Sequence, residues 1–501
     1  MSLGQRGVSE KKSLEDEEKP EFPTKSLSSD TWDLEDVDID PVVEKRLLRN
    51  IDWAILPLFM ILYTINSIDR TAVGNAKIAG LESDLGLKGF DFNKALSLFY
   101  VVFIVVEIPS DLALKRFGSI WLAFLIIAFG IIAICTAFIE NYAGLILTRI
   151  FLGLAEGGLL PGLVYVMSRY YRRRELVMRI GIFYGVSPSL ARAFGGLLSS
   201  GLLAVCPIGT VVSWRKIFLV EGIMAIGIGT ICLFALPADP EKTKMLTEEE
   251  RVVALKRIAA DSVTRTYKKE PTTAALVWRA FNVTSILTTL AFILTNISFQ
   301  GLSLYLPTVI ATLGHFTTVE SQLRTVPPYI VAIVWSLTNS YISFRIKRRG
   351  VCILVSFLLN IVGYSIFVGS GNQHARYGAC FLAISGGAPA GPMMLTWGTD
   401  NASPETVRAV TTALIVGVGQ LGAVIAVWTY LPQDAPNYIR GNSLNLGAVI
   451  LAWLLLASQV KYIYWENAKR ARGERDYRLA GKTREEIEQL GARHPGYRYQ
   501  P

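Results

Sequence analysis

The amino-acid sequence predicts an all-α polytopic membrane protein in which twelve transmembrane helices form two six-helix bundles. Three observations support this prediction: 51% of the 501 residues are hydrophobic, only 18% are charged, and the mean hydropathy is +0.38. An average soluble protein has about 25% charged residues, which cover its surface. The composition also excludes a disordered chain and a collagen-like fibre.

The transmembrane prediction depends on twelve apolar segments, six before a polar interval and six after it. Each is close to the roughly 20 residues that a helix needs to cross a bilayer core of about 30 Å. The segments are 51–68, 93–112, 120–139, 145–168, 180–203, 214–236, 283–307, 326–345, 352–369, 377–397, 409–431 and 444–465. An even number of spans places both termini on the same side of the membrane.

These spans divide the chain into five parts. We expect a disordered cytoplasmic N-terminal tail, two bundles joined by a cytoplasmic linker, and a cytoplasmic C-terminal tail. In chain order the parts are 1–48, 49–236, 237–279, 280–465 and 466–501. The first part is acidic and lacks the apolar core of a signal peptide.

Two short soluble helices are expected outside the bundles. In the linker, Thr247 and Glu250 have the spacing of a capping box, which marks the start of a helix. In the C-terminal tail, Thr483 begins a second short helix.

Basic residues indicate the orientation in the membrane. They cluster beside the spans, as in 172–174 and 347–349, and cytoplasmic loops carry such an excess of Lys and Arg. The predicted external loop 69–92 also carries basic residues, but the internal loops are denser. We therefore expect both termini in the cytosol and, as location, the plasma membrane. No basic stretch interleaves with aromatic residues, so a nucleic-acid partner is not expected.

Glycine and proline interrupt two corresponding helices. The fourth span contains Gly157, Gly158 and Pro161, and the tenth contains the run 386–392 with three glycines and two prolines. Paired interruptions in the two halves point to a substrate site of a transporter. The alternative is that these residues only let neighbouring helices pack closely.

Ionisable residues inside the spans are the next candidates, because burying a charge in a bilayer is costly. Asp69 and Arg70 lie at the outer end of the first span, where they either take part in coupling or reach the membrane surface. Glu107 lies near the cytosolic end of the second span, as a gate or as a partner for loop arginines. Glu156 lies mid-span, where burial disfavours the charged form. It is expected to exchange a proton, unless an arginine holds it permanently.

Polar and aromatic residues of the second half form the expected opposite wall of the site. An aromatic ring with amide groups would suit a planar or ring-bearing carboxylate, although each residue alone is more often a helix–helix hydrogen bond. The expected substrate-binding residues here are Asn296, Gln300, Tyr305, Trp397 and Gln420, with Asn339 as a further wall residue.

Several sequence motifs together resemble one family. They are Asp69-Arg70 followed by Gly74-Asn75-Ala76-Lys77, Glu107-Ile108-Pro109-Ser110-Asp111, Arg149 followed by Glu156-Gly157-Gly158, Trp214-Arg215-Lys216 with Glu221-Gly222, and the ending His494-Pro495-Gly496-Tyr497-Arg498-Tyr499. The string resembles the major facilitator superfamily, specifically its anion:cation symporter branch and the fungal allantoate-permease-like group. The resemblance covers about 40 to 500.

This resemblance implies a function and some roles. Members of the group carry allantoate, nicotinate, pantothenate, biotin and similar small carboxylates. Arg149 resembles the superfamily's helix-four arginine, which is tied to proton coupling; a structural pair with Asp69 or a carbonyl is the alternative. Lys115 replaces an aspartate of the superfamily's loop signature, as in other branch members. Asp111 stands where the branch usually has Asn, which leaves the gating contacts open.

Arg192, near the centre of the fifth span, departs from the branch, whose members typically have a small residue there. A guanidinium keeps its proton in a protein and needs an acceptor. Glu156, at the same depth on the fourth span, and a substrate carboxylate are the two available acceptors. We predict that Arg192 uses both in turn, with substrate displacing a protonated Glu156. A purely structural pair is the alternative.

Together these features predict a monomeric secondary transporter that carries a small organic anion with protons by alternating access. The sequence has no phosphate-binding loop for ATP-driven pumping. The chain also lacks the His/Asp cluster or activated nucleophile of an enzyme. Its cysteines and histidines are scattered, so neither a metal nor a cofactor is expected. Proton-antiport export and nutrient sensing without transport are the alternatives.

Overall fold

All twelve predicted spans are helical in the structure. The computed structural model describes residues 41–205, 211, 213–237, 239–241, 243, 245–261, 274–314, 316–482 and 490–501. The spans are α1 (Pro41–Ala76), α3 (Asp91–Phe117), α4 (Ile120–Thr136), α5 (Tyr142–Glu156) with α6 (Leu159–Tyr170), α7 (Arg173–Ala204), α8 (Arg215–Ala235), α11 (Val283–Leu313), α13 (Val326–Ile346), α14 (Arg349–Gly369), α15 (Gln373–Gly387) with α16 (Ala390–Asp400), α17 (Glu405–Gly417) with η2 (Val418–Gln420) and α18 (Leu421–Ala426), and α19 (Ile439–Ala471).

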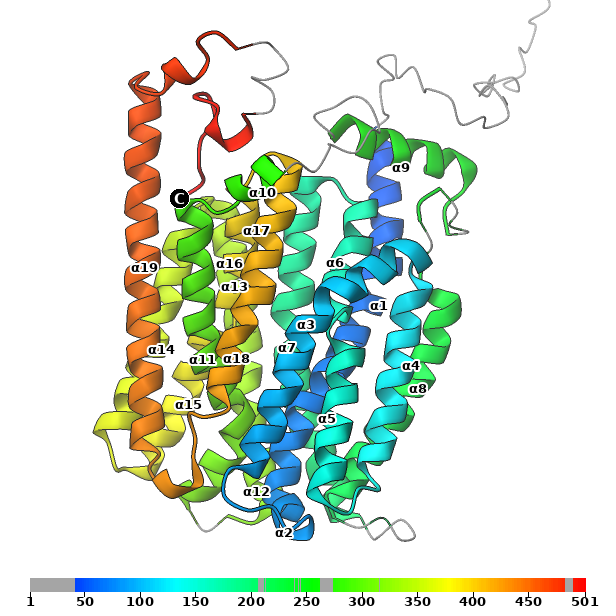
Figure 1. Cartoon of the computed structure of the whole chain (residues 1–501), viewed down its shortest axis with the longest axis vertical. Coiled ribbons are helices and arrows are strands. Elements are labelled where there is room, and N and C mark those ends of the chain that lie inside the picture. Colours follow the sequence, from blue (N-terminus) through cyan, green and yellow to red (C-terminus); the bar gives the residue numbers. More distant parts are fainter. Residues whose placement is uncertain are drawn as a thin grey trace, which may run out of the picture. The chain divides into compact units, whose positions relative to one another are not determined.

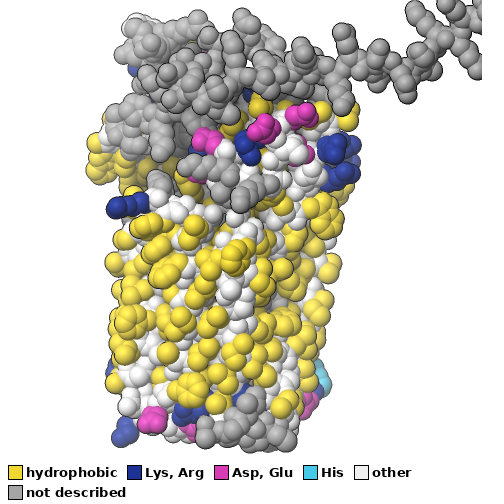
Figure 2. Space-filling view, turned by 90° about the vertical axis from the view of Figure 1, so that its right-hand side faces the viewer, with side chains coloured by type: hydrophobic (Ala, Val, Ile, Leu, Met, Phe, Trp, Pro, Cys, Tyr) yellow, Lys and Arg dark blue, Asp and Glu magenta, His cyan; other side chains and the backbone are white. Residues whose placement is uncertain are grey.

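The surface of the helices suits a bilayer. By length and composition, 8 helical segments within the described ranges are apolar enough to cross a membrane, and α4 is a shorter apolar helix. Figure 2 shows hydrophobic side chains over the middle of one face, with Lys, Arg, Asp and Glu gathered toward its two ends. An apolar belt between charged ends is what an integral membrane protein presents to lipid.

The helices form an N-terminal bundle, α1 to α8, and a C-terminal bundle, α11 to α19. The bundles meet where α7 packs against α13, α1 against α11, and α3 against α18. The helices run side by side in Figure 1, which places α9 (Glu248–Asp261) and α10 (Ala274–Arg279) at one end. At the other end lie α2 (Glu82–Asp84) and α12 (Thr318–Leu323). We call these the α9 end and the α2 end.

The first helix is longer than the sequence indicates. It runs from Pro41 to Ala76 and continues through the π-helix η1 (Lys77–Leu81), so Asp69 and Arg70 lie inside a helix and not at its end. The predicted loop 69–92 is wrong for the same reason. Four polar residues of this stretch are buried against other parts of the protein and do not face lipid, so they do not end the helix. They are Asn66, Asp69, Thr71 and Asn75.

The linker between the bundles begins its helix where the sequence predicts. The capping box is confirmed: the Glu250 amide donates to Thr247 Oγ1 over 3.3 Å, and the Thr247 amide donates to Glu250 Oε2 over 3.2 Å. The helix that follows is α9. The predicted disordered tail 1–48 is wrong in its last part, because residues 41–48 belong to α1. The rest of that tail, the middle of the linker at 262–273 and the predicted helix start at Thr483 lie outside the described residues.

The paired interruptions also occur where the sequence predicts them. The fourth span breaks between α5 and α6 at Gly157 and Gly158, and the tenth between α15 and α16 at Ala388 and Pro389. A Cβ at Gly158 would clash with the Ser110 side chain. Both interruptions therefore lie at tight packing positions as well, and Glu156 is the last residue of α5 before the first of them.

Candidate functional site

An ion pair connects α1 and α5, the first and fourth spans of the N-terminal bundle. Arg149 Nη1 lies 3.0 Å from Asp69 Oδ2, and both side chains are 2% exposed. The Arg149 guanidinium also lies over the ring of Phe218 on α8, 5.5 Å from its centroid. Arg149 Nε and Nη2 and Asp69 Oδ1 have no hydrogen-bond partner among the described residues. The pair that the sequence offered as an alternative for Arg149 is thus formed.

A second, looser ion pair lies next to the first. Arg70 Nε is 3.6 Å from Glu156 Oε2, which is longer than a hydrogen bond. The Glu156 side chain is fully buried, and Arg70 also lies over the ring of Phe103 at 5.2 Å. Glu156 is therefore held by an arginine, but at a longer distance than that between Asp69 and Arg149.

Arg192 does not pair with Glu156 as the sequence analysis predicted. Its Nη2 donates a 2.9 Å hydrogen bond to Gln300 Oε1 on α11, in the other bundle. The guanidinium lies over the ring of Phe299 at 4.8 Å, and Nη1 has no hydrogen-bond partner in the described part of the chain. Depth along a helix could be predicted from the sequence, but the direction in which the side chain leaves the helix could not. Arg192 points toward the C-terminal bundle.

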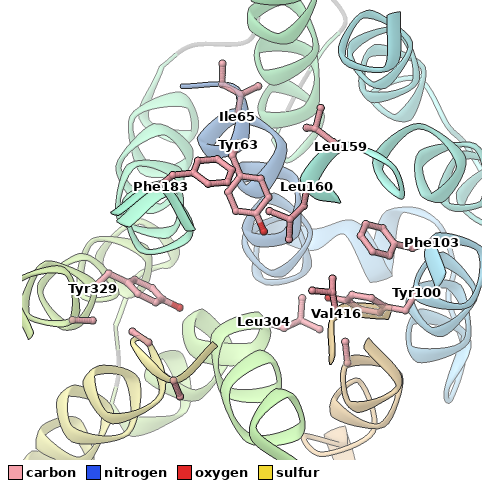
Figure 3. Close-up of a cluster of buried hydrophobic side chains, with 14 of the residues drawn as sticks. Tyr63, Ile65, Tyr100, Phe103, Leu159, Leu160, Phe183, Leu304, Tyr329 and Val416 are labelled. Atoms are coloured by element: carbon pink, nitrogen blue, oxygen red, sulfur yellow. The ribbon is translucent and has the colours of Figure 1, made fainter. Parts of the chain in front are cut away.

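Tyrosines surround the two arginines. Arg70 and Arg192 both interact electrostatically with the hydroxyl groups of Tyr63 and Tyr100. In Figure 3, Tyr63 and Tyr329 come from different bundles and direct their hydroxyl groups toward the middle of the labelled cluster. The sequence analysis missed these residues, although tyrosines inside otherwise apolar spans were a usable signal. With Glu156 ionised, Arg70, Arg192 and Glu156 have a net charge of +1.

Three of the predicted residues of the second wall lie at this depth. Gln300 accepts the hydrogen bond of Arg192. Asn296 Nδ2 donates to the Gly419 carbonyl over 3.0 Å, at the break between α17 and α18. The next residue, Gln420, is buried, and its Oε1 has no hydrogen-bond partner among the residues described. Gln300 is thus bonded to Arg192 across the bundles, whereas the Asn296 amide is bonded within the C-terminal bundle.

The other predicted wall residues lie elsewhere. The Tyr305 hydroxyl donates to the Val427 carbonyl over 2.9 Å and accepts from Asn93 at 3.1 Å, toward the α2 end. Trp397 Nε1 donates to the Gln500 carbonyl over 2.8 Å, under the C-terminal segment. Asn339 contacts Ser356 within the C-terminal bundle. The three residues form contacts within the protein, so the structure does not bring them to Arg192.

The bundles are joined at the α2 end. Asn93 donates to the Val427 carbonyl over 2.7 Å, and Trp428 Nε1 donates to Ser97 Oγ over 2.9 Å. The Leu304 carbonyl fills the space in which Gly74 would carry a Cβ. These contacts bring the two bundles into direct contact at this end.

Glu107 lies on the other side of the tyrosines, toward the α9 end. It is buried, and its Oε2 has no hydrogen-bond partner in the described ranges. A Cβ at Gly417 on α17 would lie 3.3 Å from this oxygen. Asp111, one turn further along α3, interacts electrostatically with Glu107. Glu107 is therefore placed where α3 meets the C-terminal bundle.

The sequence analysis also missed Glu221 of α8 as a site residue and used it only as part of a motif. It is 2% exposed and interacts electrostatically with Asp69, Glu156 and Arg149. The criterion that selected Glu156, an ionisable residue within a span, would have selected Glu221. Among the described residues, no group of three or more His, Cys, Asp or Glu could hold a metal ion.

Comparison with known families decides the class of the protein. The model of the Major Facilitator Superfamily matches residues 59–427. The chain belongs to the Major Facilitator Superfamily. It is similar to an uncharacterised transporter of Schizosaccharomyces pombe, with 33% identity over 86% of this chain and 85% of the relative. It is also similar to the high-affinity nicotinic acid transporter of Saccharomyces cerevisiae, with 27% identity over 85% of this chain and 79% of the relative.

Solved structures agree with this fold. A bacterial homologue of the human lysosomal transporter Spinster, in an inward-facing and unoccupied conformation, superposes with a TM-score of 0.59 at 16% sequence identity. The match covers 85% of this chain and 99% of that chain. The protein is thus an integral, multi-pass transporter of the Major Facilitator Superfamily and not an enzyme, and its superfamily carries small molecules.

Proposed function

We propose that this transporter is a proton-coupled symporter of a small organic anion. The observation that carries the proposal is Arg192, a guanidinium that is 5% exposed and forms no ion pair within the described part of the chain. A buried cation is costly unless an anion compensates it. Its Nη1 is free to bind an anion, and Arg70 on α1 adds a second positive charge.

Glu156 supplies the coupling. An anion that approaches Arg70 competes with Glu156 for the guanidinium, and a proton on Glu156 removes the competitor. By thermodynamic linkage, the bound anion then raises the proton affinity of Glu156 by the same factor. Proton and anion favour each other's binding, as symport requires. The exchange that the sequence analysis assigned to Arg192 and Glu156 is thus divided between two arginines, Arg70 as the exchanging partner and Arg192 as the fixed cation.

The transport cycle follows from the two bundles. The contacts of Asn93, Trp428 and Gly74 close the α2 end, which the distribution of basic residues assigns to the outside. Opening that end and closing the α9 end, where Glu107 and Asp111 lie, would present the site to either side in turn. In this proposal both termini are cytoplasmic, the protein lies in the plasma membrane, and a monomer is sufficient.

The substrate is proposed to be a planar or ring-bearing carboxylate. Two arginines suit the carboxylate, because a guanidinium donates two parallel hydrogen bonds to it. The remainder of such a molecule would pack against aromatic rings, which Tyr63, Tyr100 and Tyr329 supply. A relative named as a nicotinic acid transporter supports this class.

Uptake of labelled carboxylates tests the proposal. Nicotinate, allantoate, pantothenate and biotin would be offered to liposomes that contain the purified protein, at several external pH values. We expect at least one to accumulate when the outside is acidic, and a protonophore to abolish the accumulation. Efflux of the compound that is driven by protons entering in the opposite direction would instead support the antiport exporter. Absence of flux for every compound, with signalling retained in cells, would support the sensor.

A further inference from the structure

Lys77 is a largely buried cation at the α2 end that the proposed transport cycle does not yet use. It is the first residue of η1, and its side chain is 9% exposed. Its Nζ lies 4.6 Å from the centroid of the Phe92 ring on α3 and 5.1 Å from that of the Tyr305 ring on α11. The ammonium group is therefore enclosed between aromatic rings of the two bundles, and the faces of such rings attract a cation.

Arg70 and Lys77 repeat one arrangement along a single helix face. They are seven residues apart on a continuous helix, which is almost two turns and about 10 Å along the axis. Arg70 lies over the ring of Phe103, as Lys77 lies over that of Phe92. The two phenylalanines are eleven residues apart on α3, which is about three turns, so they also share a face. The two cations thus form a row that leads from the α2 end toward the site.

The bundles meet between these two cations. Gly74 lies on the same face of α1, about one turn from Arg70 and one turn from Lys77. The Leu304 carbonyl of the C-terminal bundle fills the space in which Gly74 would carry a Cβ. An anion that moves from Lys77 to Arg70 must pass this contact, so it can do so only when the bundles separate here.

The acidic partner of Lys77 is partly exposed to solvent. Nζ lies 3.3 Å from Glu82 Oε1, and the Glu82 side chain is 37% exposed. The next acids along the chain, Asp84 and Asp91, are bonded to other side chains. An exposed ion pair contributes little free energy, and an ammonium group has three N–H donors. A carboxylate from solution can therefore compete with Glu82 for Lys77.

Tyr305 covers Lys77 while the α2 end is closed. The Tyr305 hydroxyl donates to the Val427 carbonyl of its own bundle over 2.9 Å, and Asn93 of α3 donates to both groups. Separation of the bundles at this end breaks the bonds of Asn93 and carries Tyr305 away from Lys77, which belongs to the other bundle. Lys77 then faces the opening.

We propose that Lys77 is an outer binding residue for the anionic substrate, which it binds when the α2 end opens and passes on to Arg70 past Gly74. This inference rests on the proposed function. The carboxylate of the substrate takes the place of Glu82 at Nζ, and the Glu82 side chain turns to solvent. A cation at the entrance concentrates anions there and raises the rate at which they reach the site.

Charged thiol reagents test this attraction without any transported substrate. Leu304→Cys places a thiol opposite Gly74, in a protein whose exposed Cys135 is replaced by serine. Its rate of modification is measured with two impermeant methanethiosulfonates added outside, the anionic sulfonatoethyl and the cationic trimethylammonioethyl compound. Lys77→Gln should lower the ratio of the anionic to the cationic rate about tenfold. Lys94→Gln, at an exposed lysine of the same end, is the matched control and should leave the ratio unchanged. An unchanged ratio in Lys77→Gln, or no reaction with either reagent, would overturn the inference.

Transport kinetics show on which side of the membrane Lys77 acts. In intact cells, KM for an external carboxylate that the uptake panel has identified should rise about tenfold in Lys77→Gln and recover in Lys77→Arg. In inside-out vesicles, KM for the same compound at the cytoplasmic side should not change. A structural role would change both values, so equal changes would contradict the proposal.

A second variant covers the case in which Lys77→Gln does not fold. Glu82→Gln removes the competing carboxylate and should raise the ratio of the anionic to the cationic rate at Leu304→Cys. A fall or no change in this ratio would contradict the proposal. Absence of uptake of every carboxylate by the wild-type protein would instead refute the proposed function, whereas the reagent ratio would still decide the role of Lys77.

Discussion

Arg192 donates a 2.9 Å hydrogen bond from Nη2 to Oε1 of Gln300, and this bond connects α7 of the first bundle to α11 of the second. Movement of one bundle against the other must stretch or break it. The guanidinium proposed to bind the anion therefore also responds to the arrangement of the bundles. In the proposed function, anion binding and conformational change therefore act on the same side chain.

Arg192→Lys should weaken the apparent affinity for the substrate about tenfold, while the abundance of the protein in the membrane stays normal. Lysine keeps the charge but loses the planar pair of donors, and one hydrogen bond to a charged group contributes about 1.5 kcal/mol. The measurement is KM for uptake, with Arg440→Lys, at an exposed side chain, as the control. Retained affinity would reduce Arg192 to a structural cation, and loss of the protein from the membrane would assign it to the fold.

Glu156→Gln should separate anion exchange from proton coupling. The amide imitates the protonated acid and does not compete for Arg70, so exchange of labelled for unlabelled substrate across the membrane should persist. Accumulation driven by a proton gradient should be lost. Both are measured in the same liposomes, with Glu140→Gln as the control. Proton-driven accumulation at the wild-type level in Glu156→Gln would contradict the role of Glu156.

Asn93→Ala should loosen the closure at the α2 end, because it removes the hydrogen bonds to the Val427 carbonyl and to Tyr305. We expect a cysteine introduced by Leu304→Cys, opposite Gly74, to react faster with a membrane-impermeant maleimide added outside. The exposed Cys135 is first replaced by serine. Lys94→Ala, at the neighbouring exposed position, is the control. Equal labelling rates would show that Asn93 does not hold this end closed.

Asn401→Ala should lower the thermal stability of the C-terminal bundle. Asn401 Oδ1 accepts from the Gln500 amide over 2.8 Å, and its Nδ2 donates to the Gln500 carbonyl over 3.0 Å. The Gln500 carbonyl keeps the hydrogen bond from Trp397, but the Gln500 amide loses its acceptor, which costs about 1–3 kcal/mol. The readout is Tm of the purified protein, and Ser458→Ala on the exposed face of α19 is the control. A Tm equal to that of the control would mean that the C-terminal segment does not stabilise the bundle.

The sequence predicted helices better than it predicted contacts. Length and hydropathy located the twelve spans, and glycine and proline located the breaks before Leu159 and Ala390, because these are local properties of the chain. The first helix was predicted too short, since Asp69 and Arg70 interrupt an apolar run. In the structure Asp69 is buried and the Arg70 side chain is only 11% exposed, because both lie against other helices. Hydropathy measures transfer into lipid and does not register burial within a protein.

The candidate site shows the same limit. The sequence identified Arg149, Glu156 and Arg192 as ionisable groups at membrane depth, but it paired Glu156 with Arg192 where the structure pairs it with Arg70. The rotation of each helix about its axis decides such a pairing, and that rotation is set by packing. Trp397 shows the effect of a distant segment, because its indole is bonded to Gln500, 103 residues further along the chain.

Proton movement that accompanies anion entry tests the central claim most directly. Liposomes that contain the purified protein and enclose a pH-sensitive dye would receive a carboxylate that the uptake panel has identified, with protein-free liposomes as the control for passive entry of the acid. We predict that the interior acidifies as the anion enters through the wild-type protein, and that Glu156→Gln abolishes the acidification. Anion entry without acidification, or with a rise in internal pH, would contradict proton-coupled symport.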